Sequence, residues 1–550
     1  MRFHKLVLVN QDEITPNEVE NIVTPNEVES NVVPDANILP DSNALNDYQL
    51  TSDRSKRTIK MPERYKDNNL NDCNLSVFSF NVFESLECDE PKTYKEALSC
   101  SVVDCKWLFK VKQETNKVRF KAKLVAKGFT QKEGIDYAEI FAPVVKFTTV
   151  RIMLVLVAHF NWELKQMDVT TAFLHGDLDK NIYIHQPEGF VDPKLPDNVC
   201  LLKKALYGLK QSPRKWNIKF DNCMQSLKFK RSSSDHCLYF KNIDSVSVFL
   251  LLYVDDLLIV SPCLKSIEHV QKCLCDNFDM KDLGDAKKIL GMNIIRDRKK
   301  STLVLNQSAY VQKILSKFSM SDAKSVNVPL ASHFVLSKDQ SLKTETEIND
   351  MKNVPYSNTI GSVMYLMVST RPDIAYAVSC LSRYMSNPGM PHWNALKWLL
   401  RYLKSTVDVG LSFSRYHDGI KLVGYVDSNY ANDRNNRKST TSYVFTLSAT
   451  EAFKEAIWLR ALLSEIGFLD KHVVVFSDSQ SAIQLCKNPV FHDRTKHIDV
   501  RFHYIRDIVE QGIVKLEKIP SEFNHADMGT KCLSMEKFIS CQRIMNFDID

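Results

Sequence analysis

Two apolar runs flank a pair of adjacent aspartates at residues 250–260, and this pattern predicts a β-hairpin. The stretch reads LLLYVDDLLIV, and each flank has the length and composition of a buried strand. Burying unpaired carboxylates costs more free energy than a marginally stable fold has, so Asp255 and Asp256 are expected in the turn. Such a turn presents acidic oxygens at a sheet end, where hard divalent cations bind. A solvated Asp-Asp turn without a ligand is the alternative.

Other hydrophobic patterns predict the elements around this hairpin. Alternating polar and apolar residues predict a second hairpin, of half-exposed strands, at 105–112 and 118–128. An apolar helix is expected at 147–159, capped by Thr148 or Thr149. Further helices are expected at 266–278, 310–318 and 356–366, and strands that end in an aspartate at 421–427 and 473–478.

A third carboxylate, Asp168, lies at the end of an apolar segment in the stretch QMDVTTAF. Nucleotidyl transfer by two metal ions needs about two to three carboxylates that hold the ions roughly 3.5–4 Å apart. In that chemistry one ion activates a primer 3′-hydroxyl, and the other holds the triphosphate. We therefore predict that Asp168 and Asp255 bridge two Mg²⁺ or Mn²⁺ ions, with Asp256 beside them.

The composition is that of a soluble globular protein. The 550 residues are 44% hydrophobic and 25% charged, which suits three or four domains. Without an apolar run of membrane-spanning length or a signal-peptide core, the chain is expected inside the cell, in the cytoplasm or nucleus. The 14 cysteines lack zinc-ligand spacing, so neither a zinc site nor a disulfide framework is expected. Residues 1–100 hold 10 Lys and Arg against 18 Asp and Glu, so this N-terminal segment is acidic. The whole chain has a net charge of +6, so the residues after position 100 are basic, as in a protein that binds a polyanion.

The aspartate hairpin and its neighbours resemble the reverse transcriptase of copia-type LTR retrotransposons. The resemblance rests on YVDD at 253–256, QMDVTTAFLHGDL at 166–178 and LKKALYGLKQSPRKW at 202–216, and it extends over residues 86–535. It implies an α+β fold, with fingers and thumb around a palm of antiparallel strands, followed by an incomplete ribonuclease-H-like α/β domain. The implied function is RNA-directed DNA polymerase. Its partners would be an RNA template, a DNA primer, the RNA–DNA hybrid, dNTPs and two Mg²⁺ or Mn²⁺ ions, without a membrane.

The resemblance also divides the chain into regions. We expect a disordered acidic linker at 1–85, fingers and palm at 86–300, a thumb- or connection-like region at 301–415, the ribonuclease-H-like domain at 416–535 and a tail at 536–550. Protease, integrase and zinc-knuckle motifs are not recognisable, so the chain looks like a fragment of a longer polyprotein.

The same resemblance implies residues that contact the nucleotide. Phe173 is expected to abut the sugar of the incoming nucleotide, and a ring in the core is the alternative. Tyr207 and Gly208 belong to the motif that braces the templating base, where Gly208 permits a close backbone approach. Contacts to the triphosphate or to template phosphates are expected from Lys121, Lys123 and Arg214. Lysines on a solvated strand face would have the same pattern.

The C-terminal third resembles a ribonuclease H domain that has lost part of its site. Asp427, Asp478 and Asp527 follow strand-like segments, as three of the four carboxylates of a two-metal site do. The segment that carries the family's glutamate and one strand is missing between Leu447 and Ser448. Glu451 and Glu455 are the carboxylates left nearby. We therefore expect an exposed sheet edge and impaired ribonuclease H activity.

Two other functions stay open. The internal loss favours an inactive retroelement remnant that only binds nucleic acid, whereas the three intact polymerase aspartates favour activity. An unrelated metal-dependent phosphohydrolase would need neither the basic hairpin nor the LYGLKQSPR motif.

Overall fold

The computed structural model describes only part of the chain. It covers residues 6–9, 102–446 and 452–547, with gaps at 115–116, 197, 416–421, 430–432, 434, 438, 469–472, 488–506 and 546. The predicted linker at 1–85 therefore lies outside the described residues, except for strand β1 (Leu6–Val9). The sequence pattern had not predicted that strand.

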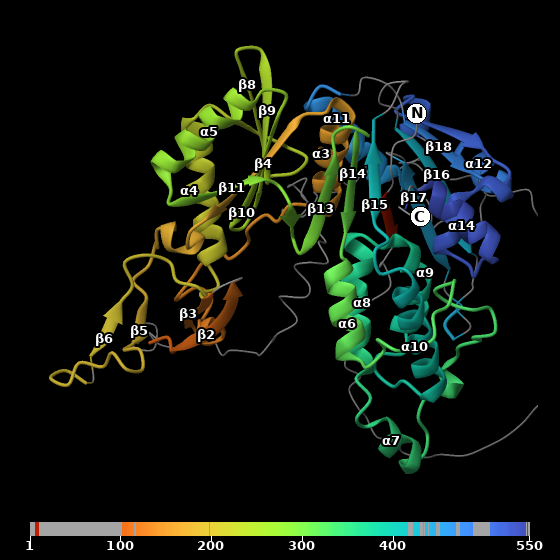
Figure 1. Ribbon diagram of the computed structural model, residues 1–550, viewed down its shortest axis with the longest axis horizontal. Coiled ribbons are helices and arrows are strands. Elements are labelled where there is room, and N and C mark those ends of the chain that lie inside the picture. The colour runs from red at the N-terminus through yellow and green to blue at the C-terminus, as the bar shows by residue number, and fades with distance from the viewer. Residues whose placement is uncertain are drawn as a thin grey trace, which may run out of the picture. The chain divides into compact units, whose positions relative to one another are not determined.

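The aspartate hairpin lies in the middle of an antiparallel sheet of six described strands (Figure 1). In spatial order these are β11 (Met280–Asp285), β4 (Glu163–Val169), β10 (Asp256–Ser261), β9 (Val246–Tyr253), β8 (Leu238–Ile243) and β7 (Lys230–Arg231). Strands β9 and β10 form the predicted hairpin, which confirms that prediction. Strand β4 pairs with the other edge of β10, so Asp168 and the hairpin turn meet at one end of the sheet.

Helices on both faces explain why β9 and β10 are apolar throughout. Helices α4 (Ser212–Ser226) and α5 (Leu264–Asn277) share one core cluster with Leu250 and Leu257. Helix α3 (Phe147–Phe160) shares the other cluster with Leu251 and Leu258. Successive strand residues point to opposite faces, so a strand covered on both faces needs apolar residues at every position.

Helix α3 is present as predicted, but its predicted cap is wrong. The N-cap position is Lys146, and Thr148 and Thr149 are buried within the first turn. The cap comes from Asp235, a buried carboxylate in the loop between β7 and β8, which accepts hydrogen bonds from the Lys146 amide (3.1 Å) and the Thr149 hydroxyl. A sequence pattern can identify a local cap, but it cannot identify a distant one.

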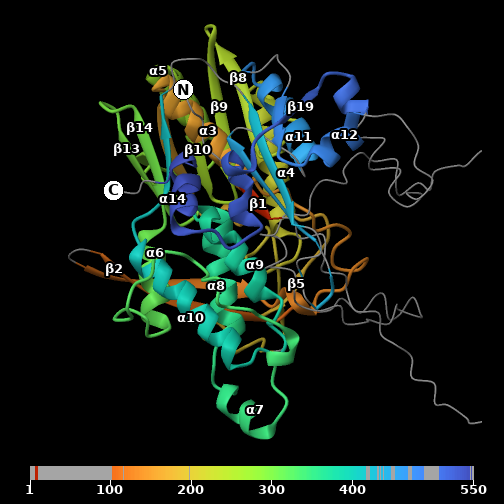
Figure 2. The same ribbon diagram turned by 90° about the vertical axis from the view of Figure 1, so that its right-hand side faces the viewer.

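A second antiparallel sheet links the middle of the chain to residues more than a hundred positions later. Its described strands are β12 (Lys288–Ile289), β13 (Met292–Asp297), β14 (Thr302–Asn306) and β15 (Leu411–Ser414). The intervening helices include α6 (Ser308–Lys317), α7 (Glu345–Met351), α8 (Tyr356–Ser369), α9 (Ala375–Ser382) and α10 (Met390–Ser405). Helices α8, α9 and α10 pack together (Figures 1 and 2). Within the described parts of the chain, none of the helices is both long enough and apolar enough to cross a membrane.

Two smaller hairpins lie before α4. Strands β2 (Cys105–Glu114) and β3 (Lys117–Ala126) pair with each other and form the predicted basic hairpin. Strands β5 (Tyr183–His185) and β6 (Val199–Leu201) form the second hairpin. A small core cluster that includes Val103, Ala126 and Ile184 joins the bases of the two hairpins.

The C-terminal region contains a mixed sheet of five described strands. Their order is β1, β17 (Thr440–Thr446), β16 (Val423–Asn429), β18 (Val473–Ser477) and β19 (Val514–Lys518). Beside them lie α11 (Ala452–Glu465), α12 (Gln480–Lys487) and α14 (Met535–Ile544). The predicted exposed edge beside β17 is wrong, because β1 pairs antiparallel with β17 along that edge. Backbone groups of β17 that would otherwise face solvent thus have partners.

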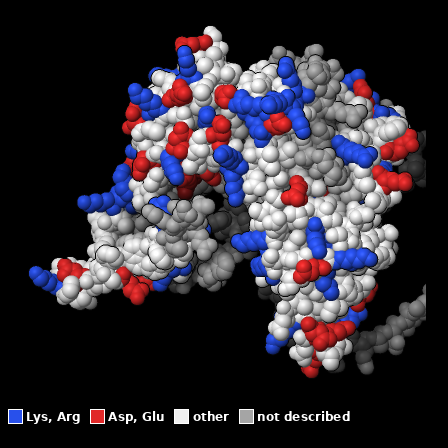
Figure 3. Space-filling model, viewed as in Figure 1, with Lys and Arg blue, Asp and Glu red and all other residues white. Residues whose placement is uncertain are grey.

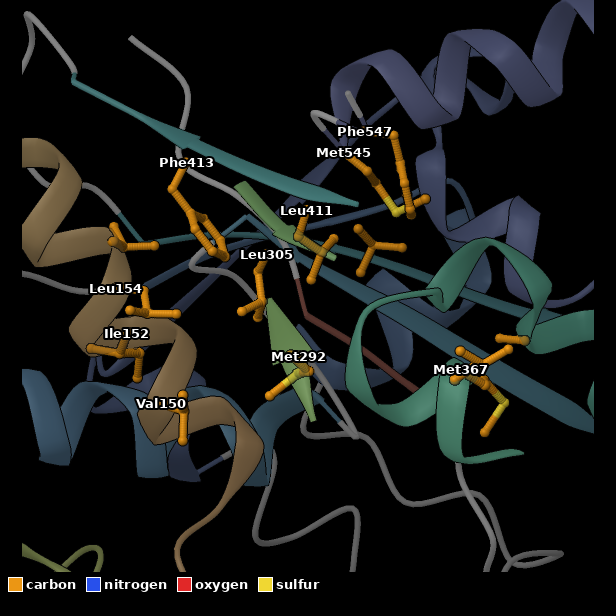
Figure 4. Close-up of a cluster of buried hydrophobic side chains, with 14 of the residues drawn as sticks. Val150, Ile152, Leu154, Met292, Leu305, Met367, Leu411, Phe413, Met545 and Phe547 are labelled. Atoms are coloured by element: carbon orange, nitrogen blue, oxygen red, sulfur yellow. The ribbon is translucent and has the colours of Figure 1, made fainter. Parts of the chain in front are cut away.

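One large core cluster spans α3, the second sheet, the helices around it and the C-terminal sheet. Figure 4 shows Leu154 of α3, Leu305 of β14 and Leu411 of β15 with Met545 and Phe547 from the end of the chain. Residues predicted to be a tail thus include helix α14 and part of this core.

Helix α14 also completes a buried polar network. Arg371 and Asp373, which are 1% and 0% exposed, form an ion pair with a distance of 2.8 Å between guanidinium and carboxylate. The hydroxyl of Tyr402 donates to the same carboxylate, and the Gln542 amide of α14 donates to that hydroxyl (2.8 Å). Buried polar groups are costly when unpaired, so Gln542 ties the C-terminal helix to this pair.

We predict that Phe538→Ala in α14 lowers the free energy of unfolding by about 3 kcal/mol, because a buried ring leaves a cavity. Phe538 is 4% exposed and lies edge-on to Tyr402, with 5.9 Å between ring centroids. Urea denaturation of the full chain measures the change, with Phe523→Ala, at a ring that is 54% exposed, as the control. Equal stability of the two variants would contradict a structural role for α14.

Candidate active site

The three predicted aspartates converge at one end of the central sheet. Asp256 begins β10 and lies directly opposite Asp168 of β4 in the strand register. Asp255 precedes it in the turn, and its carbonyl oxygen accepts a hydrogen bond from the Val169 amide (2.8 Å). The three carboxylates are close enough for their charges to act on one another, and each is half-buried.

The turn has a strained backbone at Val254, and a tryptophan side chain anchors it. Val254 has a φ of 53°, in the left-handed region that β-branched residues rarely adopt. Its carbonyl oxygen accepts a hydrogen bond from Nε1 of Trp216 (2.8 Å), a buried indole on α4. Trp216 is the last residue of the sequence motif LKKALYGLKQSPRKW, but its contact with the turn was not predicted.

Burial and mutual repulsion disfavour ionisation of the hairpin aspartates. The pKa of Asp255 is raised by burial; Lys123 opposes this shift, whereas Asp168 and Asp256 add to it. The pKa of Asp256 is raised by burial and by Asp168, against a hydrogen bond from the Gln166 amide (3.2 Å). Gln166 was not predicted, although a residue two positions before Asp168 on a strand shares its face.

One oxygen of this group has no hydrogen-bond partner among the described residues. Oδ1 of Asp255 is buried and accepts no hydrogen bond from any described residue. A buried carboxylate oxygen without a donor is destabilising unless a cation or a ligand satisfies it. This atom therefore fits a site that is built to bind a cation.

Three of the predicted nucleotide-contacting residues gather above Asp255. The ring centroids of Phe173 and Tyr207 lie 4.8 Å apart, and Nζ of Lys123 lies 4.1 Å from the Tyr207 centroid. Burial and the charges of Asp255 and Asp168 raise the pKa of Tyr207 to about 12, so its hydroxyl stays protonated and donates to Asp255. A cation, two rings and the carboxylates thus border a common space.

Gly208 lets the LYGLKQSPR segment cross the end of strand β3. It has a φ of +93°, and a Cβ at this position would lie 2.1 Å from the Ala126 carbonyl oxygen. A Cβ on Gly128 would lie 2.0 Å from the Gly208 carbonyl oxygen, so both glycines are required by contact. The Ala126 amide donates to the Tyr207 carbonyl oxygen (2.8 Å), which fixes the tyrosine relative to β3.

Two other predicted residues have different surroundings. Arg214 forms an ion pair with Glu139 and donates to the Phe141 carbonyl oxygen (3.2 Å). Lys121 is exposed on β3, opposite Lys110 of β2 in the register. The structure therefore brings Lys123, but neither Arg214 nor Lys121, to the Tyr207 ring above the aspartates.

A groove of about 370 Å³ opens on the other side of Asp256. Its walls are Gln166, Asp256, Leu283, Asp285, Lys287, Lys288, Leu290 and Gly291, from strands β4 and β10 to β12 and the turn after it. The lining therefore combines two lysines with two carboxylates, those of Asp256 and Asp285.

A second acidic cluster lies in the C-terminal sheet. Among the described residues, Asp427, Asp478 and Asp527 are the group whose carboxylate oxygens lie within 4.8 Å of one another. The pKa of Asp427 is raised by burial and by the other two aspartates, while Thr530 and Lys531 oppose the shift. The aspartates predicted from strand ends therefore do come together.

Lysines neutralise part of this cluster. Nζ of Lys531 lies 2.9 Å from Asp527 and 3.5 Å from Asp427, and Lys537 also pairs with Asp527. Glu455, one of the two suggested substitutes for the missing glutamate, accepts a hydrogen bond from Thr148 of α3 (3.4 Å). Glu451, the other, lies outside the described residues.

Helix α11 faces the central sheet rather than the acidic cluster. Glu465 accepts hydrogen bonds from the Ser232 hydroxyl (2.7 Å) and the Ser233 amide (3.0 Å). Trp458 donates to the Ser234 carbonyl oxygen (2.7 Å), and Nζ of Lys146 lies 4.3 Å from the Trp458 ring centroid. These contacts surround Asp235 and the start of α3.

Comparisons with known proteins agree with these features. Residues 91–332 match the family model for reverse transcriptase (RNA-dependent DNA polymerase). The chain is 47% identical over 469 residues to the retrovirus-related Pol polyprotein from transposon TNT 1-94 of Nicotiana tabacum, which covers 80% of this chain and 35% of that protein. It is 34% identical over 282 residues to the transposon Ty5-1 protein YCL074W of Saccharomyces cerevisiae, over 51% of this chain and 89% of that protein.

Among solved structures, the foamy viral protease-reverse transcriptase dRH in complex with ds DNA aligns with a TM-score of 0.36 and 12% identity. That alignment covers 75% of this chain and 65% of the viral one. The chain spans about a third of the length of the plant Pol polyproteins that it matches.

We predict that Asp255→Asn raises the melting temperature in EDTA at pH 7. The raised pKa means that the folded state disfavours the ionised carboxylate, and an amide removes the charge at nearly the same volume. The gain should vanish as the pH falls through the raised pKa of Asp255, because the wild-type carboxyl group is then neutral. Asp350→Asn, at an exposed site in α7, is the control for thermal unfolding. A lower melting temperature for Asp255→Asn would contradict this electrostatic account.

Proposed function

The chain belongs to the reverse transcriptase family of copia-type retrotransposons, and from this premise we propose that it is an RNA-directed DNA polymerase. It adds deoxynucleotides to a primer 3′-hydroxyl with the help of two divalent cations. The observation that carries the proposal is the convergence of Asp168, Asp255 and Asp256 at one sheet end, beneath the Phe173 and Tyr207 rings. The phosphohydrolase alternative does not explain why a lysine and two aromatic rings border the carboxylates.

The donor set fits Mg²⁺ or Mn²⁺. Carboxylate oxygens are the ligands that hard divalent cations prefer, and Oδ1 of Asp255 lacks any other partner among the described residues. Asp168 and Asp255 would hold the ions, with Asp256 beside them. When bound, such ions lower the pKa of a hydroxyl nucleophile and neutralise charge on the phosphates.

The remaining side chains position the nucleotide. Lys123 lies where a triphosphate would approach Asp255, and its charge already favours the ionised form of that carboxylate. Phe173 is half-buried and in contact with Tyr207, so part of its ring stays exposed near the aspartates. We propose that this ring excludes a 2′-hydroxyl by contact, as the resemblance implies.

The partners of the polymerase would be an RNA template, a DNA primer, their hybrid and dNTPs. Both signs of charge are mixed over the face in Figure 3, so a uniform positive field does not support this proposal. The support is local: Lys123 lies beside the aspartates, and Lys287 and Lys288 line the groove next to Asp256. Lysines at these two places suit a triphosphate on one side and a primer end on the other.

We also propose that the C-terminal acidic cluster is a ribonuclease H site with impaired activity. Asp427, Asp478 and Asp527 supply three carboxylates, which can hold one cation. Among the described residues a second cation would lack a fourth carboxylate, since Glu455 accepts a hydrogen bond from Thr148 and is not part of this group. Lys531 and Lys537 further compete with any cation for Asp527.

We predict that Asp168→Asn and Asp255→Asn each reduce primer extension on an RNA template by about three orders of magnitude or more. Loss of a metal ligand removes stabilisation of the charge that develops in the transition state. Extension of a labelled primer by the purified full chain measures the effect, and Asp350→Asn is the control. Undiminished extension by either variant would remove the polymerase assignment, and an inactive wild type would favour the inactive remnant.

We predict that Phe173→Val admits ribonucleotides while deoxynucleotide incorporation continues. Removing the ring opens space for the 2′-hydroxyl, and discrimination falls because it depended on a clash. The ratio of kcat/KM for dNTPs and rNTPs measures this change, with Phe523→Val as the control. If wild type and Phe173→Val discriminate equally, Phe173 is a core ring and not a gate.

We predict that RNA in a labelled hybrid survives under conditions in which the same protein extends a primer. The missing carboxylate should slow cleavage by about three orders of magnitude, on the scale of a lost electrostatic contact. Gel analysis of both strands in one reaction gives the comparison. Hybrid RNA degradation that depends on Asp478 would refute the proposed impairment.

A further inference from the structure

Strand β1 closes the outer edge of the C-terminal sheet, although it comes from the other end of the chain. All four of its residues pair with β17, from Leu6 opposite Phe445 to Val9 opposite Ser442. Residues 10–101 separate β1 from the next described residue, so its neighbours along the chain do not impose this position. The contacts of β1 with the sheet must therefore hold it there.

Strand β17 is buried along the edge that β1 covers. Ser442, Tyr443 and Val444 are between 0% and 6% exposed. Successive strand residues point to opposite faces, so β17 is covered on both faces at this point. Backbone amide and carbonyl groups of a strand without access to water need protein partners. The outer edge of β17 is therefore a site that requires an added strand.

The seat of β1 is specific for a short apolar strand. Besides β17, β1 contacts helix α9 and the 3-10 turn η5 (Pro372–Ile374), so the added strand lies between the sheet and helical elements (Figure 2). The sequence of β1, LVLV, has no charge and no proline. Valine and other apolar residues suit a strand that is enclosed in this way.

The same edge is connected to the C-terminal acidic cluster. In the strand register, Val9 lies opposite Ser442, and Ser442 lies opposite Asp427 of β16. Gly529, two residues after Asp527, packs so closely on Ser442 that a Cβ at Gly529 would clash with the serine side chain. Ser442 thus lies between β1 and the surroundings of two of the three clustered aspartates.

We propose that the outer edge of β17 is an acceptor site for a short apolar strand, and that residues 6–9 occupy it in place of the strand lost between Leu447 and Ser448. Occupancy of this site holds Ser442, and through it Asp427, in the arrangement that binds a cation. The part about the cation rests on the proposed ribonuclease H site. The acceptor site itself rests on the pairing and on the burial of β17.

The first test asks whether the acceptor site binds its strand when the strand is supplied as a separate peptide. Val7→Pro/Leu8→Pro in the full chain disables β1, because one of two consecutive prolines removes an amide that faces β17. Val7→Ile/Leu8→Ile is the matched control, since isoleucine also favours strands. The probe is a fluorescein-labelled peptide of residues 3–12, and fluorescence anisotropy measures its affinity.

The peptide should bind the proline variant about tenfold or more tightly than it binds the wild type or the isoleucine control. In those two proteins the tethered strand competes at a high effective concentration. A peptide with the same two prolines should not bind. Amides of residues 440–446 should exchange hydrogen faster in the proline variant and should be protected again when the wild-type peptide is added.

The second test measures cation binding rather than catalysis. Mn²⁺ binding is followed by electron paramagnetic resonance in an Asp255→Asn background, and the ion bound at the acidic cluster is the one lost in Asp478→Asn. The proline variant should bind this ion about tenfold more weakly, on the scale of a lost orienting contact, and the wild-type peptide should restore the affinity.

Three outcomes would overturn the acceptor site. The first is a proline variant whose β17 amides stay protected without the peptide, and the second is a lack of peptide binding to that variant. The third is a wild-type dimer that the proline substitutions convert to monomers, which would assign the strand to a second copy of the chain. If the proline variant does not fold alone, refolding with the wild-type peptide supports the site, and failure to refold with it refutes the site.

The two parts of the proposal fail separately. Unchanged Mn²⁺ affinity in the proline variant would refute the link between β1 and the acidic cluster. A wild-type protein without an Asp478-dependent Mn²⁺ ion would instead contradict the proposed ribonuclease H site. Peptide binding to the proline variant would still establish the acceptor site in that case.

Discussion

The pairing of β4 with β10 is the constraint on which the candidate active site depends. It places Asp168 opposite Asp256, and the amide of Val169 holds the backbone of Asp255 beside them. The negative charges of the three carboxylates repel one another, so contacts elsewhere in the fold must stabilise the arrangement. That support comes from an apolar core on both faces of the sheet and from the Trp216 indole beneath the turn. The stability of the core offsets the electrostatic strain of the site.

The hairpin and its aspartates were predictable because their signals are local. An apolar run of strand length on each side of two charges leaves few alternatives to a hairpin, and Asp168 has the same kind of flank. The need for glycine at position 208 was also predictable, because the motif implied a close approach of the backbone there. The structure shows that approach, since a Cβ on Gly208 would clash with the Ala126 carbonyl oxygen. The polymerase roles of these residues stay predictions.

What the sequence did not predict depends on partners that are distant along the chain. Asp235 caps α3 from almost ninety positions away, so Thr148 and Thr149 were wrongly taken as caps. Strand β1 pairs with β17 across more than four hundred residues, and no periodicity in four residues could indicate that pairing. The orientation of α11 could not be predicted either, because its sequence does not specify whether Glu455 faces a metal site or a neighbouring helix.

Helix α14 ends the described chain, yet its Gln542 completes the network around Arg371, and Met545 and Phe547 belong to the main core. A core that helix α3 shares with the last described residues gives distant mutations a common effect. A premature stop codon or frameshift that removes the last twenty residues would leave every polymerase motif intact in the reading frame. It would nevertheless open the core that supports them. The last described residues are therefore needed for the same fold that brings Asp168, Asp255 and Asp256 to one end of the central sheet.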